Sequence, residues 1–413
     1  MRSFFRKLLE VDPLCSQANG AKRQFDVLFS MSDMIRIERI IVTEVLVPAH
    51  PRAVNGTGVH QPLHKLPVAG EPAWSKQFDE LPKAILELHL DDGTVGLGEF
   101  YRDHDWRIVE NIASNLIGSE IENLSRRSLP IAHCREYDGF ECAVWDAYAK
   151  IHSLRLVDLL GGPVRERIWV GAWSGHRALQ EIRSLVEQFH SLGFDCIKFK
   201  CSLEDDVVGW CTEIAEHAPG MQVILDPNER WEQPAEARKR IDRLRDLTNV
   251  LCLEDPLPRW MLHEYAQLKS YSSIPIVLHV SLPYIYHGQR VHDAIAALKL
   301  SAVDGFNFNG GLVGFQQLDH IAAAANLPCW HGSEIDLGIL EAMYLHQCAA
   351  AESCQWPSDI FGRLIREHDL LTSPLDIQPP HAMLPSGYGL GVELDRDAVR
   401  HYQTETREYR GEL

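Results

Sequence analysis

The sequence lacks several features that mark membrane, nucleic-acid-binding or disulfide-rich secreted proteins. No stretch of its 413 residues contains the roughly 18 uninterrupted apolar residues that a membrane-spanning helix needs. Basic residues are in the minority: 40 Lys and Arg stand against 58 Asp and Glu. The ten cysteines show no CxxC spacing and are sparse for a secreted disulfide scaffold. We therefore expect a cytoplasmic protein with reduced thiols and no membrane partner.

The charge balance also bears on the partners. A formal net charge of -18 argues against a nucleic-acid partner, because phosphate backbones need a basic surface. It does not exclude an anionic substrate, since a few lysines in a cleft dominate the local field. Composition therefore favours an enzyme or binding protein for small molecules.

The first half of the chain predicts two regions. Charges interrupt every apolar stretch of residues 1–33, which we interpret as an extension that is disordered or precedes the true start. Residues 34–165 predict an α+β domain, with a hairpin turn at Asp91-Asp92-Gly93 and helical periodicity over residues 105–160. The loop at residues 49–78 is rich in Pro, Gly and His, and loops of this length are usually functional, as lids are.

The pattern changes near residue 166, where short apolar runs begin to alternate with amphipathic helices. Such alternation indicates parallel βαβ units. Seven or more units within residues 166–372 predict an α/β fold with a closed TIM-type (β/α)7β barrel rather than an open sheet. Residues 373–413 revert to turns and a short strand, and we expect this tail to return to the first domain.

Polar side chains stand at the ends of consecutive predicted barrel strands. Lys198 and Lys200 end the second strand, Asp226 the third and Glu254 the fourth, and His279 lies on the fifth. The steps from Lys200 are 26, 28 and 25 residues, one βα repeat each. Because the carboxyl ends of barrel strands meet at one rim, these groups are predicted to converge there.

Carboxylates gathered at such a rim repel one another unless a cation neutralises them. Oxygen ligands from separate strands suit Mg²⁺ or Mn²⁺. A lysine beside the site can be shifted toward its neutral form and act as a base. The pattern therefore predicts a metal-assisted proton transfer.

These motifs resemble the enolase superfamily, in its muconate-lactonising and mandelate-racemase branch. The resemblance is carried by KFK, LDPNERW and CLEDP at one-repeat spacing, and by DGTVGLGE, FECAVWDAYAK and GSEIDLGILEAMYLHQCAAA. It covers nearly everything from Ile35 onward. It implies a barrel with an N-terminal α+β capping domain completed by the C-terminal tail, a small carboxylate substrate and a homo-oligomer.

The resemblance also implies residue roles. A divalent metal, normally Mg²⁺, would lie on Asp226 and Glu254 and stabilise the enediolate formed when the α-proton leaves. Lys200 would be the base, while Lys198 would favour its neutral form and help to hold the carboxylate. Asn228 would lie next to Asp226 and support it without binding the metal itself. The long loop would close over the barrel and select the substrate.

Three positions depart from the family pattern. His279 stands where the third metal ligand is normally Asp, Glu or Asn; if it is a ligand, imidazole suits Mn²⁺ or another transition metal better than Mg²⁺. Asn307 and Asn309 occupy the sixth strand, where relatives carry a Lys or Asp. His331 falls one position before the aligned catalytic His, and a small register shift would place it on the far face.

These departures leave several functions open. A single base at Lys200 favours elimination of a β-hydroxyl, as in a hydroxy-acid or sugar-acid dehydratase. A racemase or epimerase working between Lys200 and His331, or a cycloisomerase, is the alternative. A degenerate barrel that binds a ligand without turnover is the alternative from another class.

Overall fold

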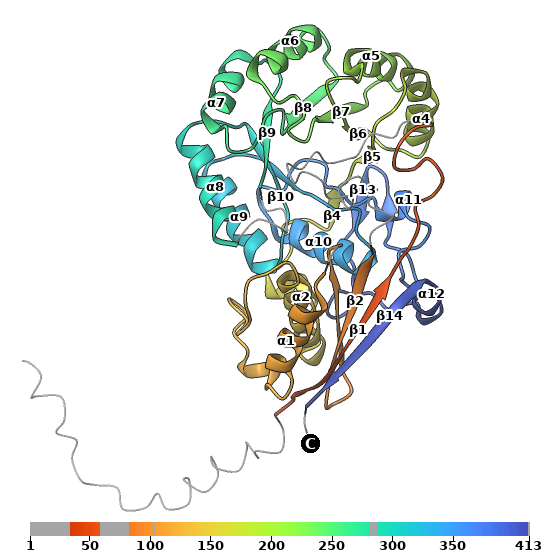
Figure 1. The fold of residues 1–413 in the computed structure, drawn as a ribbon, viewed down its shortest axis with the longest axis vertical. Helices are drawn as coiled ribbons and strands as arrows, with labels where there is room; N and C mark the ends of the chain where they lie inside the picture. The colour runs from red at the N-terminus through yellow and green to blue at the C-terminus, as the bar shows by residue number, and fades with distance from the viewer. Residues whose placement is uncertain (1–33, 58–81, 103, 281–286, 412–413) are drawn as a thin grey trace, which may run out of the picture.

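The computed structural model describes residues 34–57, 82–102, 104–280 and 287–411. The predicted extension 1–33 and residues 58–78 of the predicted lid lie outside these ranges. Figure 1 shows a narrower part built on a twisted antiparallel sheet and a wider part in which helices surround parallel strands. Within the described ranges, no helix is both long and apolar enough to cross a bilayer.

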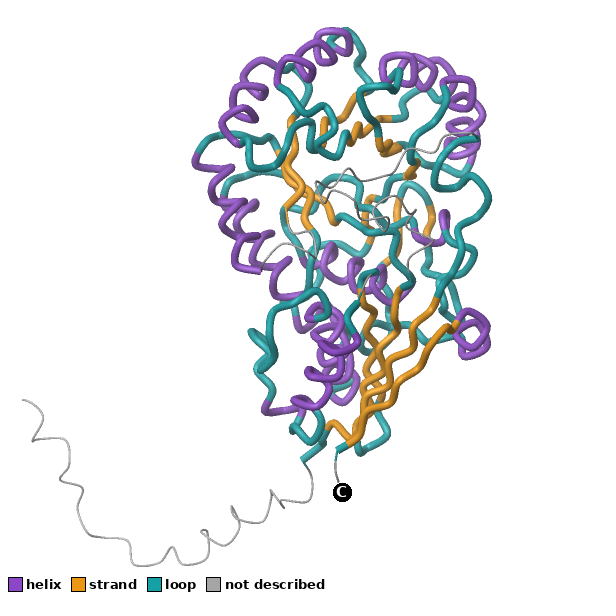
Figure 2. Tube along the Cα trace, in the orientation of Figure 1, coloured by secondary structure: helices purple, strands orange, loops and turns teal. Residues whose placement is uncertain are grey.

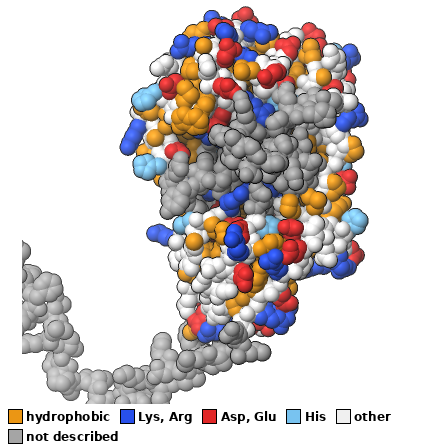
Figure 3. All heavy atoms as spheres, viewed as in Figure 1, with side chains coloured by type: hydrophobic (Ala, Val, Ile, Leu, Met, Phe, Trp, Pro, Cys, Tyr) orange, Lys and Arg blue, Asp and Glu red, His pale blue; other side chains and the backbone are white. Residues whose placement is uncertain are grey.

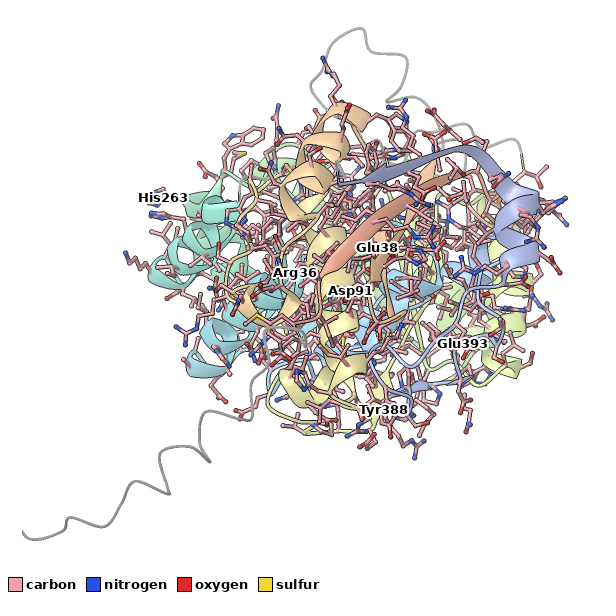
Figure 4. The ribbon with its side chains drawn as sticks, turned by 90° about the horizontal axis from the view of Figure 1, so that it is seen from below. Arg36, Glu38, Asp91, His263, Tyr388 and Glu393 are labelled. Atoms are coloured by element: carbon pink, nitrogen blue, oxygen red, sulfur yellow. The ribbon has the colours of Figure 1, made fainter. Side chains whose placement is uncertain are left out.

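The narrower part contains a four-stranded antiparallel sheet with the order β14-β1-β2-β3. Its strands are β1 (Ile37–Val45), β2 (Lys83–Leu90), β3 (Val95–Phe100) and β14 (Gln403–Arg410). The predicted hairpin joins β2 to β3. Its Asp91 accepts the backbone N–H of Arg36 at 3.0 Å, and both residues are labelled in Figure 4. Since β14 pairs with β1, the C-terminal tail returns to this sheet.

Helices cover one face of this sheet. They are α1 (Trp106–Leu116), the 3-10 turn η3 (Ile121–Asn123), α2 (Tyr137–Ile151) and α3 (Leu156–Leu159). The predicted helical span therefore breaks between α1 and α2. Apolar side chains of α1 and α2 share a core with β1 and β2. Glycines of β3 let α2 approach so closely that a Cβ at Gly98 would lie 2.2 Å from the backbone oxygen of Gly139.

Gly98→Ala is therefore expected to destabilise the fold. The helix backbone cannot give way as a flexible side chain would, so we expect a loss of about 2 to 3 kcal/mol. Gly171→Ala is the matched control, because a Cβ there meets its nearest atoms at 3.6 Å, an ordinary contact. Thermal unfolding of both variants measures the difference, and equal melting temperatures would contradict the close approach.

The wider part contains seven parallel strands in the order β11-β10-β9-β8-β7-β6-β5. The strands are β5 (Ala172–Ser174), β6 (Cys196–Lys200), β7 (Gln222–Asp226), β8 (Val250–Glu254), β9 (Ile276–Val280), β10 (Gly305–Phe308) and β11 (Cys329–His331). Figure 2 shows the helices on the outside of this curved sheet. They are α4 (Leu179–Ser191), α5 (Val207–His217), α6 (Pro234–Leu244), α7 (Leu262–Tyr271), α8 (His287–Lys299), α9 (Leu312–Ala324) and α10 (Gly338–Ala350).

Local chemistry explains where several helices begin. Asp206 accepts the backbone N–H of Gly209 and so caps α5. Pro234 opens α6, at a position where the missing N–H costs nothing. The remaining elements are α11 (Gly362–Ile365), β12 (Ile377–Gln378), β13 (His381–Met383) and α12 (Arg396–Tyr402).

The first apolar run after residue 166, RIWVGAW at residues 167–173, splits between two sheets. Its first half is β4 (Arg167–Trp169), which pairs with β13. Only β5 joins the parallel sheet. Val170 lies between β4 and β5 and donates its N–H to the carbonyl of Pro380. The chain therefore leaves the sheet of β4 before it enters the parallel sheet at β5.

The two edges of the seven-stranded sheet are linked through a segment after α10. Parallel bridges join Cys329 of β11 to Cys354, and Val170 to Ser358. Inside the curve, one side chain from each of several strands forms a compact apolar layer. Its members are Cys196, Ile224, Cys252, Val277 and Trp330.

Two buried carboxylates tie the narrower part to the helices of the wider one. Glu99 accepts the N–H groups of Leu337 and Leu340, at the start of α10. Glu141 of α2 accepts the N–H groups of Leu312 and Val313, at the start of α9. The unpaired N–H groups of a helix N-terminus favour such acceptors. Burial nevertheless raises the pKa of Glu141 to about 8.

This shift predicts a pH dependence of stability. The unfolded chain loses the Glu141 proton near its ordinary pKa of 4.5, whereas the folded protein keeps it until about 8. Unfolding therefore releases a proton between these values, and stability falls as pH rises, with a slope of up to about 1.4 kcal/mol per pH unit. Glu141→Gln keeps the acceptor oxygen and should flatten the decline in melting temperature between these limits. The exposed Glu216→Gln is the control, and an unchanged profile in Glu141→Gln would refute the assignment.

Candidate metal-binding and catalytic site

Four of the predicted residues meet directly at the carboxyl ends of β6, β7 and β8. The Lys200 ammonium lies 2.5 Å from Asp226 Oδ2. The Lys198 ammonium lies 2.6 Å from Glu254 Oε2 and 3.4 Å from Asp226 Oδ2. All four side chains are buried. Lys200 and Asp226 are register partners on β6 and β7, which places the two residues at the same level of the sheet.

Asp359 is a third carboxylate at this position, and the sequence reasoning missed it. Its Oδ2 lies 2.9 Å from the Lys198 ammonium. Its backbone N–H donates to the carbonyl of His331 at 2.8 Å, which fixes the segment after α10 against β11. The sequence signal was the charged residue in WPSDI, in the segment that links the two edges of the sheet.

His279 and Asn307 surround Glu254 from the other side. Asn307 donates from Nδ2 to Glu254 Oε1 at 2.7 Å, and His279 Nδ1 lies 3.4 Å from the same oxygen. The two residues are register partners on β9 and β10. The Nε2 atom of His279 is buried and has no hydrogen-bond partner among the described residues. The structure thus brings both to the predicted site.

Asn228 supports Asp226 through its backbone. Its N–H donates to Asp226 Oδ1 at 2.9 Å, and its side-chain oxygen accepts from Arg259 at 3.4 Å. Asn228 and Asp255 have φ angles of 50° and 45°, a left-handed conformation that is uncommon outside glycine. Such residues cluster at functional sites, where the surrounding structure holds the strain.

The carboxylates crowd one another strongly. Burial, with the neighbouring Asp226, raises the pKa of Glu254 to about 8. Burial also acts on Asp226, but the two lysines outweigh it and hold the pKa of Asp226 below its ordinary value. Burial lowers the pKa of His279 well below its ordinary value, so its imidazole is neutral and keeps a lone pair. Closely packed carboxylates and a neutral imidazole together make a donor set for a cation.

The donor set fits a divalent ion. The Lys198 ammonium already lies within 3.4 Å of oxygens from both Asp226 and Glu254, so these carboxylates share a common point. Oxygen atoms with one imidazole suit Mn²⁺ or Fe²⁺ at least as well as Mg²⁺. The unpartnered Nε2 of His279 is the observation that favours an ion here.

The ligand atoms that lie closest together among the described residues form a slightly different set. Glu254, Asp255 and His279 offer atoms within 4.8 Å of one another, and Asp226 is not in that group. Asp255 is a weaker candidate, because Arg259 binds its Oδ2 through Nε at 2.7 Å and Nη2 at 2.5 Å. Asp226 is held by Lys200 instead, so a ligand role for Asp226 needs the lysine to move aside.

His331 is not brought together with these residues. Its neighbour Trp330 points into the barrel layer, and alternation along β11 turns His331 to the helix side. There its ring stacks on Phe315 and Tyr344, with centroids 4.6 and 3.8 Å away. Burial lowers its pKa to about 4. The expected register shift does not occur, and no contact links this imidazole to either lysine.

Comparison with known proteins agrees with this architecture. The family model described as enolase C-terminal domain-like matches residues 181–398. The chain therefore belongs to the enolase superfamily, in its mandelate-racemase and muconate-lactonising branch, and is an isomerase or lyase of that superfamily. Its fold is an α/β TIM-like fold with a capping domain.

Individual relatives are distant but span most of the chain. Muconate cycloisomerase 1 of Rhodococcus opacus is 28% identical over 81% of this chain and 85% of its own length. The o-succinylbenzoate synthase of Bacillus subtilis is 26% identical over 78% and 89%. The solved structure of an N-succinyl Arg/Lys racemase from Bacillus cereus superposes with a TM-score of 0.76 at 18% identity, covering 91% of this chain and all of its own.

Proposed function

We propose that the protein removes the proton next to the carboxylate of a small acid, with Lys200 as the base, and that elimination of a β-hydroxyl follows. The observation that carries the proposal is the pair of lysines on β6 set directly against the acidic ends of β7 and β8. Enolase-superfamily sites pair a Lys or His base with a metal that stabilises an ene-diolate, which supports the first step. The elimination is our inference from the residues that are absent on the opposite side.

Each group has a defined task in this proposal. The neutral amine of Lys200 takes the α-proton, and its ammonium form returns that proton to the departing hydroxyl. Lys198 stays charged, because Asp359, Glu254 and Asp226 outweigh the effect of burial and raise its pKa well above the ordinary value. Its positive charge attracts the substrate carboxylate.

A divalent ion held by Glu254, His279 and Asp226 would supply positive charge for the substrate carboxylate and lower the energy of the enediolate. The protein's own part is to hold the ligands in place. Asn307 does so for Glu254, and the backbone of Asn228 does so for Asp226.

The opposite side of the site favours elimination over racemisation. Asn307 on β10 presents an amide, which hydrogen-bonds but does not transfer protons at neutral pH. His331 lies between β11 and helices α9 and α10. A second candidate is cycloisomerisation, which also needs one base and is favoured by the cycloisomerases among the sequence relatives.

Exchange of the substrate α-hydrogen in D₂O tests the first step directly. The protein, supplied with Mg²⁺ or Mn²⁺, is incubated with a library of hydroxy acids, sugar acids, muconates and N-acyl amino acids. Exchange followed by loss of water supports the dehydratase, and exchange with ring closure supports the cycloisomerase. Failure of every acid to exchange would support the non-catalytic barrel.

His331→Asn separates one-base from two-base chemistry. We expect α-hydrogen exchange and product formation to remain largely intact, because the ring contacts Phe315 and Tyr344 rather than the lysines. The melting temperature should fall, since two aromatic contacts are lost. Exchange of one enantiomer with loss of inversion would show instead that His331 is a second base.

A further inference from the structure

Three buried cysteines form a cluster beside the site that the proposed chemistry does not use. Cys329 is the first residue of the edge strand β11, Cys348 lies on α10, and Cys354 follows that helix. Their exposed fractions are 0, 0 and 5%. The Cys354 sulfur is hydrogen-bonded to both other thiols. The cluster therefore contains one central sulfur with two neighbours in reach.

The backbone sets Cys329 and Cys354 as direct partners. They form a parallel bridge, in which Cys329 donates its N–H to Ser353 and accepts from Gln355. Neighbouring strands lie about 4.8 Å apart, which falls within the range of about 4.4 to 6.8 Å between the Cα atoms of disulfide-bonded cysteines. The backbone spacing of a bridged pair is therefore compatible with a disulfide.

A metal ion explains this cluster less well. Among the described residues, the ligand sets close enough to share one ion are Glu254 with Asp255 and His279, and an exposed set on α5. The three thiols are not among them, although His331 lies nearby. A pairwise reaction between sulfurs fits the arrangement better than joint coordination.

Cys354 is the more reactive partner. Hydrogen bonds from Cys329 and Cys348 lower the pKa of the Cys354 thiol well below its ordinary value. Burial raises the pKa of Cys329 well above it. The thiolate is the nucleophile in thiol oxidation, so Cys354 reacts first.

We propose that Cys354 and Cys329 form a reversible disulfide when the protein meets a peroxide. The Cys354 thiolate attacks one peroxide oxygen, the O–O bond breaks, and a sulfenic acid and water result. The Cys329 sulfur then attacks the Cys354 sulfur and displaces its hydroxyl group as water, which forms the disulfide bond. Two thiols are oxidised, one hydrogen peroxide is reduced, and two waters form.

A cavity lies close to the cluster. A cavity of about 200 Å³ is lined by Asp319, Gln347, Ala351 and Glu352, among others. Asp319 accepts the hydroxyl of Ser353 at 2.6 Å, and that hydroxyl lies 3.1 Å from the Cys329 sulfur. One residue therefore separates the cavity from the thiols.

The disulfide would also reach the candidate active site. Ser358 lies 3.5 Å from the Cys354 sulfur and accepts the backbone N–H of His331 at 3.1 Å. The next residue, Asp359, holds Lys198. Covalent closure of the bridge is thus expected to slow turnover reversibly. This consequence rests on the proposed function, whereas the disulfide itself does not.

Peptide mapping tests the disulfide on the full-length protein. The protein is treated with hydrogen peroxide, its free thiols are alkylated, and it is digested without reduction. Trypsin is unsuitable, because no Lys or Arg lies between Lys299 and Arg363. A protease specific for glutamate cleaves after Glu334, Glu341 and Glu352, and so puts the three cysteines in three peptides. We expect the Cys329 and Cys354 peptides to be linked, and dithiothreitol to release them.

Two variants sharpen the result. Cys354→Ala should abolish the linked peptide, and Cys211→Ala, which changes a buried thiol on α5, should leave it unchanged. No linkage in the wild type, linkage of a different pair, or oxidation only to sulfinic acid would overturn the proposal. If the linked peptide forms but no acid exchanges its α-hydrogen under any condition, the disulfide stands and the proposed function fails.

Discussion

Lys200→Ala is expected to abolish both turnover and α-hydrogen exchange, a loss on the order of 10² to 10⁴ in rate for a general base. The reason is that, of the two lysines at the carboxyl end of β6, Lys200 is paired with a single carboxylate, that of Asp226. Lys198 cannot replace it readily, because three carboxylates keep its ammonium charged. Exchange of deuterium into the most active acid of the library, followed by mass spectrometry, gives the measurement.

Two further variants make this result specific. Lys200→Arg should not rescue exchange, because a guanidinium stays protonated and cannot serve as a base. Lys239→Ala, on the exposed surface of α6 and paired with Glu236, should exchange like the wild type. If Lys200→Ala still exchanges every substrate, the proposed base is wrong and the lysines serve only to bind the carboxylate.

The site was largely predictable because strand ends repeat in sequence. Lys198, Lys200, Asp226 and Glu254 were placed together from one-repeat spacing, and the structure brings all four into contact. Asp359 was missed because its segment joins the sheet through isolated bridges and has no clear apolar strand before it. Local periodicity predicts elements well but carries little information about a partner 161 residues away.

His331 shows the limit of the same reasoning. A three-residue strand does not reveal which side faces inward, and one position of shift moves a side chain to the other face. Only the packing of Trp330 in the interior layer decides that His331 points to the helices. The run RIWVGAW shows a similar limit. Its continuous apolar pattern indicates one strand, but its two halves pair in different sheets.

The surface follows composition more simply. Figure 3 shows acidic and basic side chains interspersed over the described part of one face. The excess of carboxylates lies partly inside the molecule, where Glu99, Glu141 and the site residues are buried. Part of the net negative charge therefore lies in internal helix caps and at the candidate cation site.

Glu254→Ala is expected to remove divalent-ion binding. Glu254 lies between Lys198 on one side and His279 and Asn307 on the other, and it belongs to both candidate ligand sets. Loss of a supporting residue typically costs about 10- to 100-fold in metal affinity, and loss of a direct ligand should cost more. Titration with Mn²⁺, followed by electron paramagnetic resonance or calorimetry, measures this without any substrate.

His279→Asn tests the identity of the ion. An amide oxygen replaces imidazole, so we expect Mg²⁺ to bind more tightly relative to Mn²⁺ than in the wild type. Asp226→Asn and Asp255→Asn then identify the remaining ligand. If Asp226 binds the ion, metal affinity falls in Asp226→Asn. If Asp255 binds it, as in the set Glu254, Asp255 and His279, metal affinity falls in Asp255→Asn. Unchanged Mn²⁺ affinity in Glu254→Ala would show that these carboxylates serve only as partners of Lys198. The acidic side chains would then serve only to hold Lys198 and Lys200 in position, and the reaction would need no metal ion at the carboxyl ends of these strands.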